Sequence, residues 1–234
     1  MRSHAWAISW EACSQGYIDR VEFDACMSAE IDGMLSNTEN QDGIDLRNGC
    51  HDITISNITG GTGDDVIALT AIRSHDLYPG GSMKTTHVMH SDWSRRETDI
   101  YNITITNVAA YSKGRICWVI RLLPADCNIY NVVIDNVIDT SPEGYGIGGV
   151  ILLGEPDSNY GKNLPGSLKN IVISNIIGNC NTTISIEGYL EHSVISNIIN
   201  KGKNSPVIYV SRKKGMENVE ISNIEAHGKI INYR

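Results

Sequence analysis

The chain has 234 residues and a formal net charge of −8, with 41% hydrophobic and 20% charged residues. This composition is that of a folded protein with a sizeable core, and it excludes an intrinsically disordered chain. The acidic balance argues against nucleic acid or an anionic membrane surface as the main partner, and no segment is long and apolar enough to be a membrane span.

The first residues, MRSHAWAISWEACSQ, lack a basic start followed by a long apolar run, so the sequence predicts no secretion signal in the chain as given. The six cysteines, at 13, 26, 50, 117, 127 and 180, form no CxxC pair and no metal-ligand spacing. They are interpreted as small buried apolar residues, and no metal or other cofactor is expected.

One phrase, apolar-x-apolar-x-Asn-apolar, recurs along the chain. It is found at 51–60 (HDITISNITG), 100–109, 129–138, 168–177, 190–199 and 216–225, with a weaker copy at 17–26. A second short apolar run follows most copies, at 65–69, 116–123, 149–154, 182–188, 206–211 and 229–233. Alternation of this length predicts β-strands, and no window favours an amphipathic helix.

The spacing of these copies predicts the fold class. Their Asn residues are 57, 107, 136, 175, 197 and 223, so the shortest period is 22 residues. Short units of this kind bury their apolar faces only by stacking on one another, as in a solenoid. The expected fold is all-β, a single-stranded right-handed parallel β-helix, forming one domain over 1–234 with loop insertions at about 71–99 and 140–167.

The recurring Asn should occupy the same corner of every coil. Asn tolerates the left-handed backbone conformation, and its side-chain amide can bond to the next Asn in a ladder. As a member of this ladder, Asn57 is expected to be buried. The two ends of such a coil are open strand edges, and neither MRSHAWAISW nor GKIINYR is typical of a cap. The chain is therefore expected to be truncated or to have uncapped ends, through which copies can associate as a homo-oligomer.

Two aspartate clusters bracket the segment NQDGIDLRNGCHDITISNITGGTGDDVIAL at 40–69. Asp42 and Asp64 are 22 residues apart, one bare repeat, so they should lie one coil apart with Asp65 close by. Alternation turns Asp45 away from the core if Ile44 and Leu46 face it. Such carboxylates are compatible with turn capping, with calcium binding, or with the acid and base of glycoside cleavage.

The same segment resembles glycoside hydrolase family 28, the polygalacturonase-like enzymes of the pectate-lyase-like β-helix class. That family carries Asn-Thr-Asp-Gly-Ile-Asp, then a strand with the Asn phrase, then Gly-Asp-Asp before an aliphatic strand. This chain has Gln41-Asp42-Gly43-Ile44-Asp45 and Gly63-Asp64-Asp65, in the same order and at nearly the same gap. The resemblance implies that Asp42, Asp64 and Asp65 are catalytic, one as general acid and the others positioning and deprotonating water, with inversion.

The resemblance also implies substrate-binding residues. His87 and His90 occupy the approximate place of the family's His, and Arg115 and Arg121 are nearest to its Arg-x-Lys pair, which grips a substrate carboxylate. Apart from the resemblance, Trp93, Arg95 and Arg96 in the first insertion suit stacking on a sugar and binding of acidic groups. Four residues of the second insertion are further candidates: Tyr145, Glu155, Asp157 and Tyr160.

The favoured interpretation is a hydrolase of polysaccharides or oligosaccharides, needing no cofactor and having neither nucleic acid nor membrane as partner. By resemblance, it would be extracellular or periplasmic. Two alternatives remain open. One is a non-catalytic carbohydrate-binding β-helix, such as part of a phage tail or adhesin. The other is a calcium-dependent polysaccharide lyase.

Overall fold

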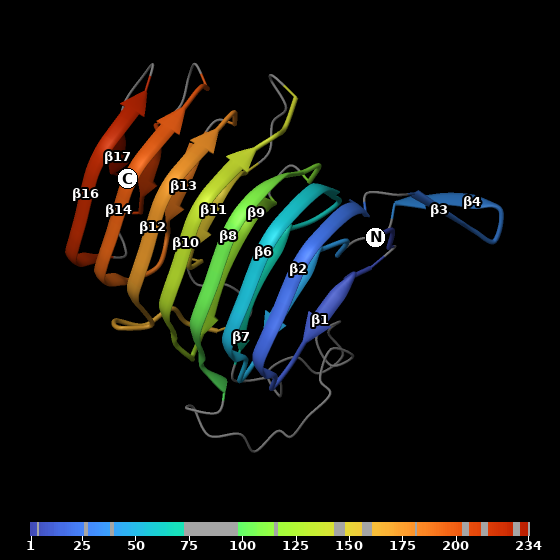
Figure 1. The fold of residues 1–234 in the computed structure, drawn as a ribbon, viewed down its shortest axis with the longest axis horizontal. Coiled ribbons are helices and arrows are strands. Elements are labelled where there is room, and N and C mark those ends of the chain that lie inside the picture. Colours follow the sequence, from blue (N-terminus) through green and yellow to red (C-terminus); the bar gives the residue numbers. More distant parts are fainter. Residues whose placement is uncertain are drawn as a thin grey trace.

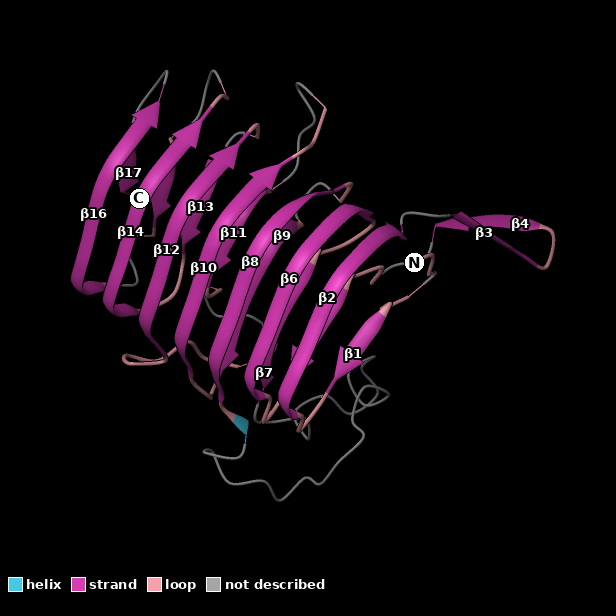
Figure 2. Ribbon diagram, in the orientation of Figure 1, coloured by secondary structure: helices cyan, strands magenta, loops and turns pink. Residues whose placement is uncertain are grey.

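A computed structural model describes residues 1–3, 5–25, 28–37, 40–72, 98–114, 117–142, 148–155, 161–180, 182–202, 206–211, 215–226 and 230–233. Apart from a helical residue at Thr98, just before β8, every element in these ranges is a β-strand, and almost all of the strands belong to two parallel sheets that lie face to face (Figures 1 and 2). Within the described residues, no helix is long and apolar enough to cross a membrane.

The chain alternates between the two sheets as it advances along their common stack. The seven-stranded sheet contains β2 (Ser14–Ala25), β6 (His51–Thr62), β8 (Ile100–Ser112), β10 (Ile129–Asp139), β12 (Leu168–Gly178), β14 (Leu190–Asn200) and β16 (Met216–Ala226). The eight-stranded sheet contains β1 (Ile8–Trp10), β5 (Ile44–Arg47), β7 (Ile67–Ile72), β9 (Trp118–Ala125), β11 (Gly149–Leu153), β13 (Thr182–Ile186), β15 (Ile208–Val210) and β17 (Ile231–Tyr233). The stacked parallel strands predicted from the repeat are thus confirmed.

Equivalent positions of the repeated phrase lie side by side in the seven-stranded sheet. Ile105 pairs with Ile134, Ile134 with Ile173, and Ile173 with Ile195, and all four side chains are fully buried. The same in-register columns of Ile, Val and Leu run through both sheets and form one continuous core between them. Branched aliphatic side chains fit a pleated surface and pack tightly. Columns of them fill the core between the sheets, so the core needs few aromatic side chains.

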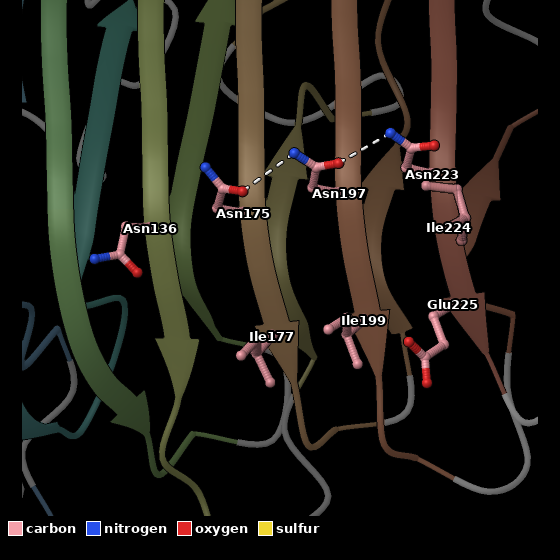
Figure 3. A pocket seen from close by; sticks show the side chains of 8 residues that line it. All are labelled: Asn136, Asn175, Ile177, Asn197, Ile199, Asn223, Ile224 and Glu225. Atoms are coloured by element: carbon pink, nitrogen blue, oxygen red, sulfur yellow. Dashed lines mark hydrogen bonds between the residues drawn. The ribbon is translucent and has the colours of Figure 1, made fainter.

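The recurring Asn residues form the predicted corner. Asn57, Asn107, Asn136, Asn175, Asn197 and Asn223 all have φ between 52° and 57°, in the left-handed region. The amide of Asn197 donates to Asn175 and that of Asn223 to Asn197 (Figure 3). The ladder is interrupted after Asn136, because the Asn175 amide donates to Asp135 at 2.7 Å instead. These side chains are exposed, so the expectation that Asn57 is buried was wrong.

A second ladder lies at the other bend of the same strands, and the sequence analysis did not predict it. The amide of Asn102 donates to Asp52, that of Asn131 to Asn102 and that of Asn170 to Asn131. Each of these four residues also has a left-handed φ. The strands β6, β8, β10 and β12 therefore bend twice, and side-chain amide bonds are present at both bends.

The two ends of the stack differ from its middle. The last strand of the seven-stranded sheet, β16, has exposed Glu220 and Glu225 where β14 has Val194 and Ile199. Charges on an edge strand oppose pairing with a further strand. Near the other end, β3 (Ser28–Ile31) and β4 (Met34–Asn37) form an antiparallel hairpin that projects from the stack (Figure 1).

Candidate active site

The candidate site lies on the outward face of the eight-stranded sheet. Asp45, Ala68 and Arg121 occupy neighbouring positions on β5, β7 and β9, and all three turn away from the core between the sheets. Ala68 has the smallest side chain of the three, so a hollow of about 60 Å³ is left between the carboxylate and the guanidinium group. Asp42, Asp64 and Asp65 also line this hollow, so the structure brings all three predicted catalytic residues together.

Asp42 and Asp65, not Asp42 and Asp64, are equivalent in the stack. Ile44 pairs with Ile67, and the backbone N–H of Gly43 donates to the carbonyl of Asp65. Paired residues of β5 and β7 are therefore one residue further apart in the sequence than the shortest repeat. The expected alignment of Asp42 with Asp64 was wrong by one residue, and Asp42 aligns with Asp65. A side chain at 63 would force Gln41 to shift, because a Cβ there would lie 2.9 Å from the Gln41 Cβ.

Asp65 is the most tightly held of the carboxylates. It is 1% exposed, its Oδ1 accepts the backbone N–H of Trp118 at 2.6 Å, and its Oδ2 accepts Arg121 Nη1 at 3.2 Å. Burial raises the pKa of Asp65 to about 6, although the Arg121 charge and these two hydrogen bonds act in the opposite direction. At neutral pH this carboxyl is therefore mainly ionised and fixed in orientation.

Asp42 and Asp45 are buried with fewer interactions that stabilise the ionised carboxylate than Asp65 has. Burial, reinforced by the charges of Asp45, Asp64 and Asp65, raises the pKa of Asp42 well above its usual range. Burial likewise raises the pKa of Asp45 to about 8. No hydrogen-bond partner among the described residues reaches Asp45 Oδ2, and the side chain is 3% exposed. Asp45 therefore favours the protonated form at neutral pH, and the pKa of Asp42 is shifted in the same direction.

Asp64 is more exposed than its neighbours and lies at the rim. Its Oδ1 accepts the backbone N–H of Asp65 at 3.0 Å, and its carbonyl accepts the Thr62 hydroxyl at 2.6 Å. The Thr62 and Asp65 bonds hold the turn in place while leaving the carboxylate facing the hollow. The pocket thus combines Asp65, mainly ionised at neutral pH, with Asp45, mainly protonated, and acid–base catalysis requires such a combination.

Asp64, Asp65 and Cys117 could together hold a metal ion. One potential ligand atom from each lies within 4.8 Å of the others. Burial, then a hydrogen bond with Asp64 and the nearby aspartate charges, raises the pKa of the Cys117 thiol. Because thiolate is the form that binds metals, this environment disfavours Cys117 as a ligand.

Two guanidinium groups accompany the carboxylates. Arg121 donates from Nη1 to Asp65 and from Nη2 to Glu155, so it links the start of β7 to the residue that follows β11. Arg47 is 2% exposed, and its guanidinium carbon lies 4.7 Å from the centre of the Trp6 ring. Arg121, expected from the sequence to bind substrate, is thus already paired with carboxylates of the protein.

Several predicted site residues lie outside the described residues. These are His87, His90, Trp93, Arg95 and Arg96 in the first insertion, Arg115 before β9, and Tyr145, Asp157 and Tyr160 in the second insertion. Their predicted roles are not tested by the structure. Glu155, at the edge of the second insertion, is described and belongs to the site through Arg121.

The sequence analysis missed Asp45, Arg47, Trp6 and Ala68 as parts of the site. For Asp45 a signal was present, since alternation placed it on the same outward face as the hollow. Trp6 and Arg47 gave no signal, because the contact between them joins β5 to a residue that precedes β1, and the repeated phrase does not specify that alignment.

A larger groove of about 500 Å³ runs beside the Asn ladder on the seven-stranded sheet (Figure 3). Glu225 is the single ionisable side chain among the residues that line it, so it offers no acid–base pair. The smaller, carboxylate-lined pocket is therefore the better candidate for chemistry.

The chain was compared with known proteins in three ways. No protein-family model, no curated protein and no solved structure matches it significantly.

Proposed function

We propose that this protein is a polysaccharide-acting glycoside hydrolase built on a right-handed parallel β-helix. The observation that carries the proposal is the pocket in which Asp42, Asp45 and Asp65 are buried beside the more exposed Asp64. Glycoside hydrolysis needs one carboxyl that keeps its proton and one that is ionised, and unequal environments create such a pair. The resemblance of residues 40–69 to glycoside hydrolase family 28 supports the same chemistry.

In the proposed mechanism, Asp42 is the general acid. Its raised pKa favours the protonated carboxyl, and that proton passes to the glycosidic oxygen as the bond to the anomeric carbon breaks. Asp65, held by Trp118 and Arg121, positions a water molecule. Asp64 removes a proton from that water as its oxygen attacks the anomeric carbon from the opposite face, which inverts the configuration.

A second candidate function is a cation-dependent polysaccharide lyase. The proximity of the Asp64 and Asp65 carboxyl groups favours it, since clustered oxygen ligands bind calcium. A lyase would abstract a proton and leave an unsaturated sugar, whereas a hydrolase adds water. The two therefore differ in product and in their need for a cation. A non-catalytic carbohydrate-binding protein is the third candidate, and it predicts binding without turnover.

The test is release of reducing sugar from a panel of polysaccharides, with and without EDTA, by the wild type and Asp64→Asn. The proposal predicts release that survives EDTA, shows no new ultraviolet absorbance and is lost in Asp64→Asn. An unsaturated product that requires the cation would support the lyase. Binding of a polymer without release of sugar would support the non-catalytic protein.

A further inference from the structure

Carboxylates extend beyond the hollow along the outward face of the eight-stranded sheet. Asp42 and Asp45 belong to the β5 region, Asp64 and Asp65 precede β7, Glu155 follows β11 and Glu187 follows β13. These strands are neighbours in the order β5-β7-β9-β11-β13. With strands about 4.8 Å apart, the acidic track spans roughly 19 Å along the stack.

Both described arginines that line the pocket are engaged by the protein itself. Arg121 binds two carboxylates at once, Asp65 and Glu155. Arg47 is almost completely buried against Trp6. Among the residues that the structure describes, the four aspartates of the hollow therefore face two guanidinium groups, and both of these already interact with other side chains of the protein.

Arg121 would be costly to divert to a ligand. Asp65 is 1% exposed and depends on Arg121 and on the Trp118 N–H for its stabilisation. Withdrawing the guanidinium group would leave a buried carboxylate with a single donor, which is strongly unfavourable. Arg121 therefore positions Asp65 and is not available to grip a carboxylate of the substrate.

The track remains acidic further from the hollow. Glu187 is partly buried and accepts the Ser185 hydroxyl at 2.9 Å, and burial, reinforced by the charge of Glu155, raises its pKa. A glycan lying along the stack from the hollow to Glu187 would meet four acidic side chains, Asp64, Asp65, Glu155 and Glu187, against the two guanidinium groups of Arg47 and Arg121. A carboxylate on each sugar would be repelled at short range, where partial burial weakens solvent screening.

We propose that the substrate is a glycan without carboxylates in the rings that occupy this track, in contrast to the uronic-acid polymers that the sequence resemblance implies. The inference rests on the proposed hydrolase function and defines the class of its substrate. The hydroxyl groups of neutral sugars can donate hydrogen bonds to the carboxylates of such a track. Anionic sugars can donate the same bonds, but their own carboxylates are repelled by the track.

The test uses matched substrates that differ in charge. The panel contains neutral polysaccharides and uronic-acid polymers, and each uronic-acid polymer is supplied both as the free acid and as its methyl ester. We expect kcat/KM to be at least about tenfold higher for a neutral or esterified member than for any free acid. Higher salt should lower KM for a free acid and leave KM for its ester unchanged, because salt screens repulsion.

A free acid hydrolysed as well as its ester and as well as the best neutral polymer would overturn the inference and leave the proposed hydrolase standing. No turnover of any member of the panel would contradict the hydrolase itself, and the inference with it. The two failures are thus distinguishable.

The variant Glu155→Gln isolates the electrostatic contribution. It removes one negative charge from the track and releases one side of Arg121, so the preference for ester over free acid should fall about threefold to tenfold. Glu217→Gln, which removes an exposed charge from the seven-stranded sheet, should leave that preference unchanged. If Glu155→Gln lowers kcat/KM equally for both forms, its role is purely structural and the inference fails.

Discussion

Aspartates occur on the outward faces of both sheets, and the two sheets treat them in opposite ways. On the seven-stranded sheet, hydrogen bonds from Ser56 and Asn57 lower the pKa of Asp19, and bonds from Asn102 and His51 lower that of Asp52. On the eight-stranded sheet, burial raises the pKa of Asp45 and Asp65. The same residue type is thus a structural acceptor on one face and a titratable group on the other.

The comparison shows how a repetitive scaffold acquires a specialised site. On the seven-stranded sheet, Asn recurs at equivalent positions from β6 to β16, and most of these residues bond to the Asn of a neighbouring strand. Around the pocket the repeat is broken: Asp45, Ala68 and Arg121 occupy one row and have different sizes and charges. Chemistry is expected where the side chains stop repeating, and the following substitutions test this separation.

The largest expected effect is on activity. Asp65→Asn removes the charge that Arg121 and Trp118 hold in place, and it should reduce kcat by about 10²- to 10⁴-fold. The measurement is reducing-sugar release by the polymer that the wild type hydrolyses best, with circular dichroism to confirm the fold. Asp24→Asn, an exposed carboxylate that pairs with Arg2, is the matched control and should retain full activity.

A substitution in the core face of the seven-stranded sheet should lower stability and leave activity unchanged. Ile134 is fully buried in the column between Ile105 and Ile173, and Ile134→Ala should lower the free energy of unfolding by about 2 to 5 kcal/mol. Urea denaturation measures the loss. Activity per folded molecule should be unchanged at low temperature, and a large fall in kcat would show that the two faces are not independent.

Asp45→Asn should increase stability at alkaline pH. The folded state holds the Asp45 proton up to a pKa of about 8, whereas the unfolded chain loses it near pH 4, so the unfolding free energy falls as pH rises between these values. Asn has no proton to lose. The variant should exceed the wild type by roughly 2 to 4 kcal/mol at pH 8.5 and match it at pH 4. Thermal denaturation at the two pH values gives the comparison, and an equal stability difference at both would refute the burial of this carboxyl.

The smallest effect concerns the ladder. Asn197 has φ 56° and bonds to both Asn175 and Asn223. Asn197→Ala loses these bonds and puts Ala, which tolerates the left-handed region less well than Asn, at this position, so it should cost about 1 to 3 kcal/mol. Asn197→Gly loses the same bonds, but Gly adopts the left-handed conformation readily, so this variant should lose less unfolding free energy. Denaturant unfolding of both variants measures the difference. Equal losses would mean that the backbone conformation contributes nothing.

Much of the fold could be predicted from the sequence because the repeated phrase specifies local structure. The alternation of Ile and Val located the long strands to within a few residues, and each recurring Asn marked a left-handed bend. The hairpin at 28–37 was not predicted, although Asp32-Gly33 at its turn is a pair that such turns favour.

The site could be predicted only in part. The two aspartate clusters were identifiable because they interrupt strands, but their alignment to the residue was not, since links of variable length separate the short strands. Alternation indicates which face Asp45 occupies and does not reveal what covers it. The pairing of Arg121 with Glu155 was also beyond prediction, because it joins β9 to a residue that follows β11.

The most direct test of the account is a carbon-13 NMR titration of the aspartate carboxyl groups in the folded protein. The account predicts that Asp65 titrates near pH 6 and Asp45 near pH 8, while Asp19 and Asp52 titrate below the usual aspartate value. If the aspartates of both sheets titrate together near pH 4, the pocket holds no proton at neutral pH and the proposed acid–base chemistry is contradicted.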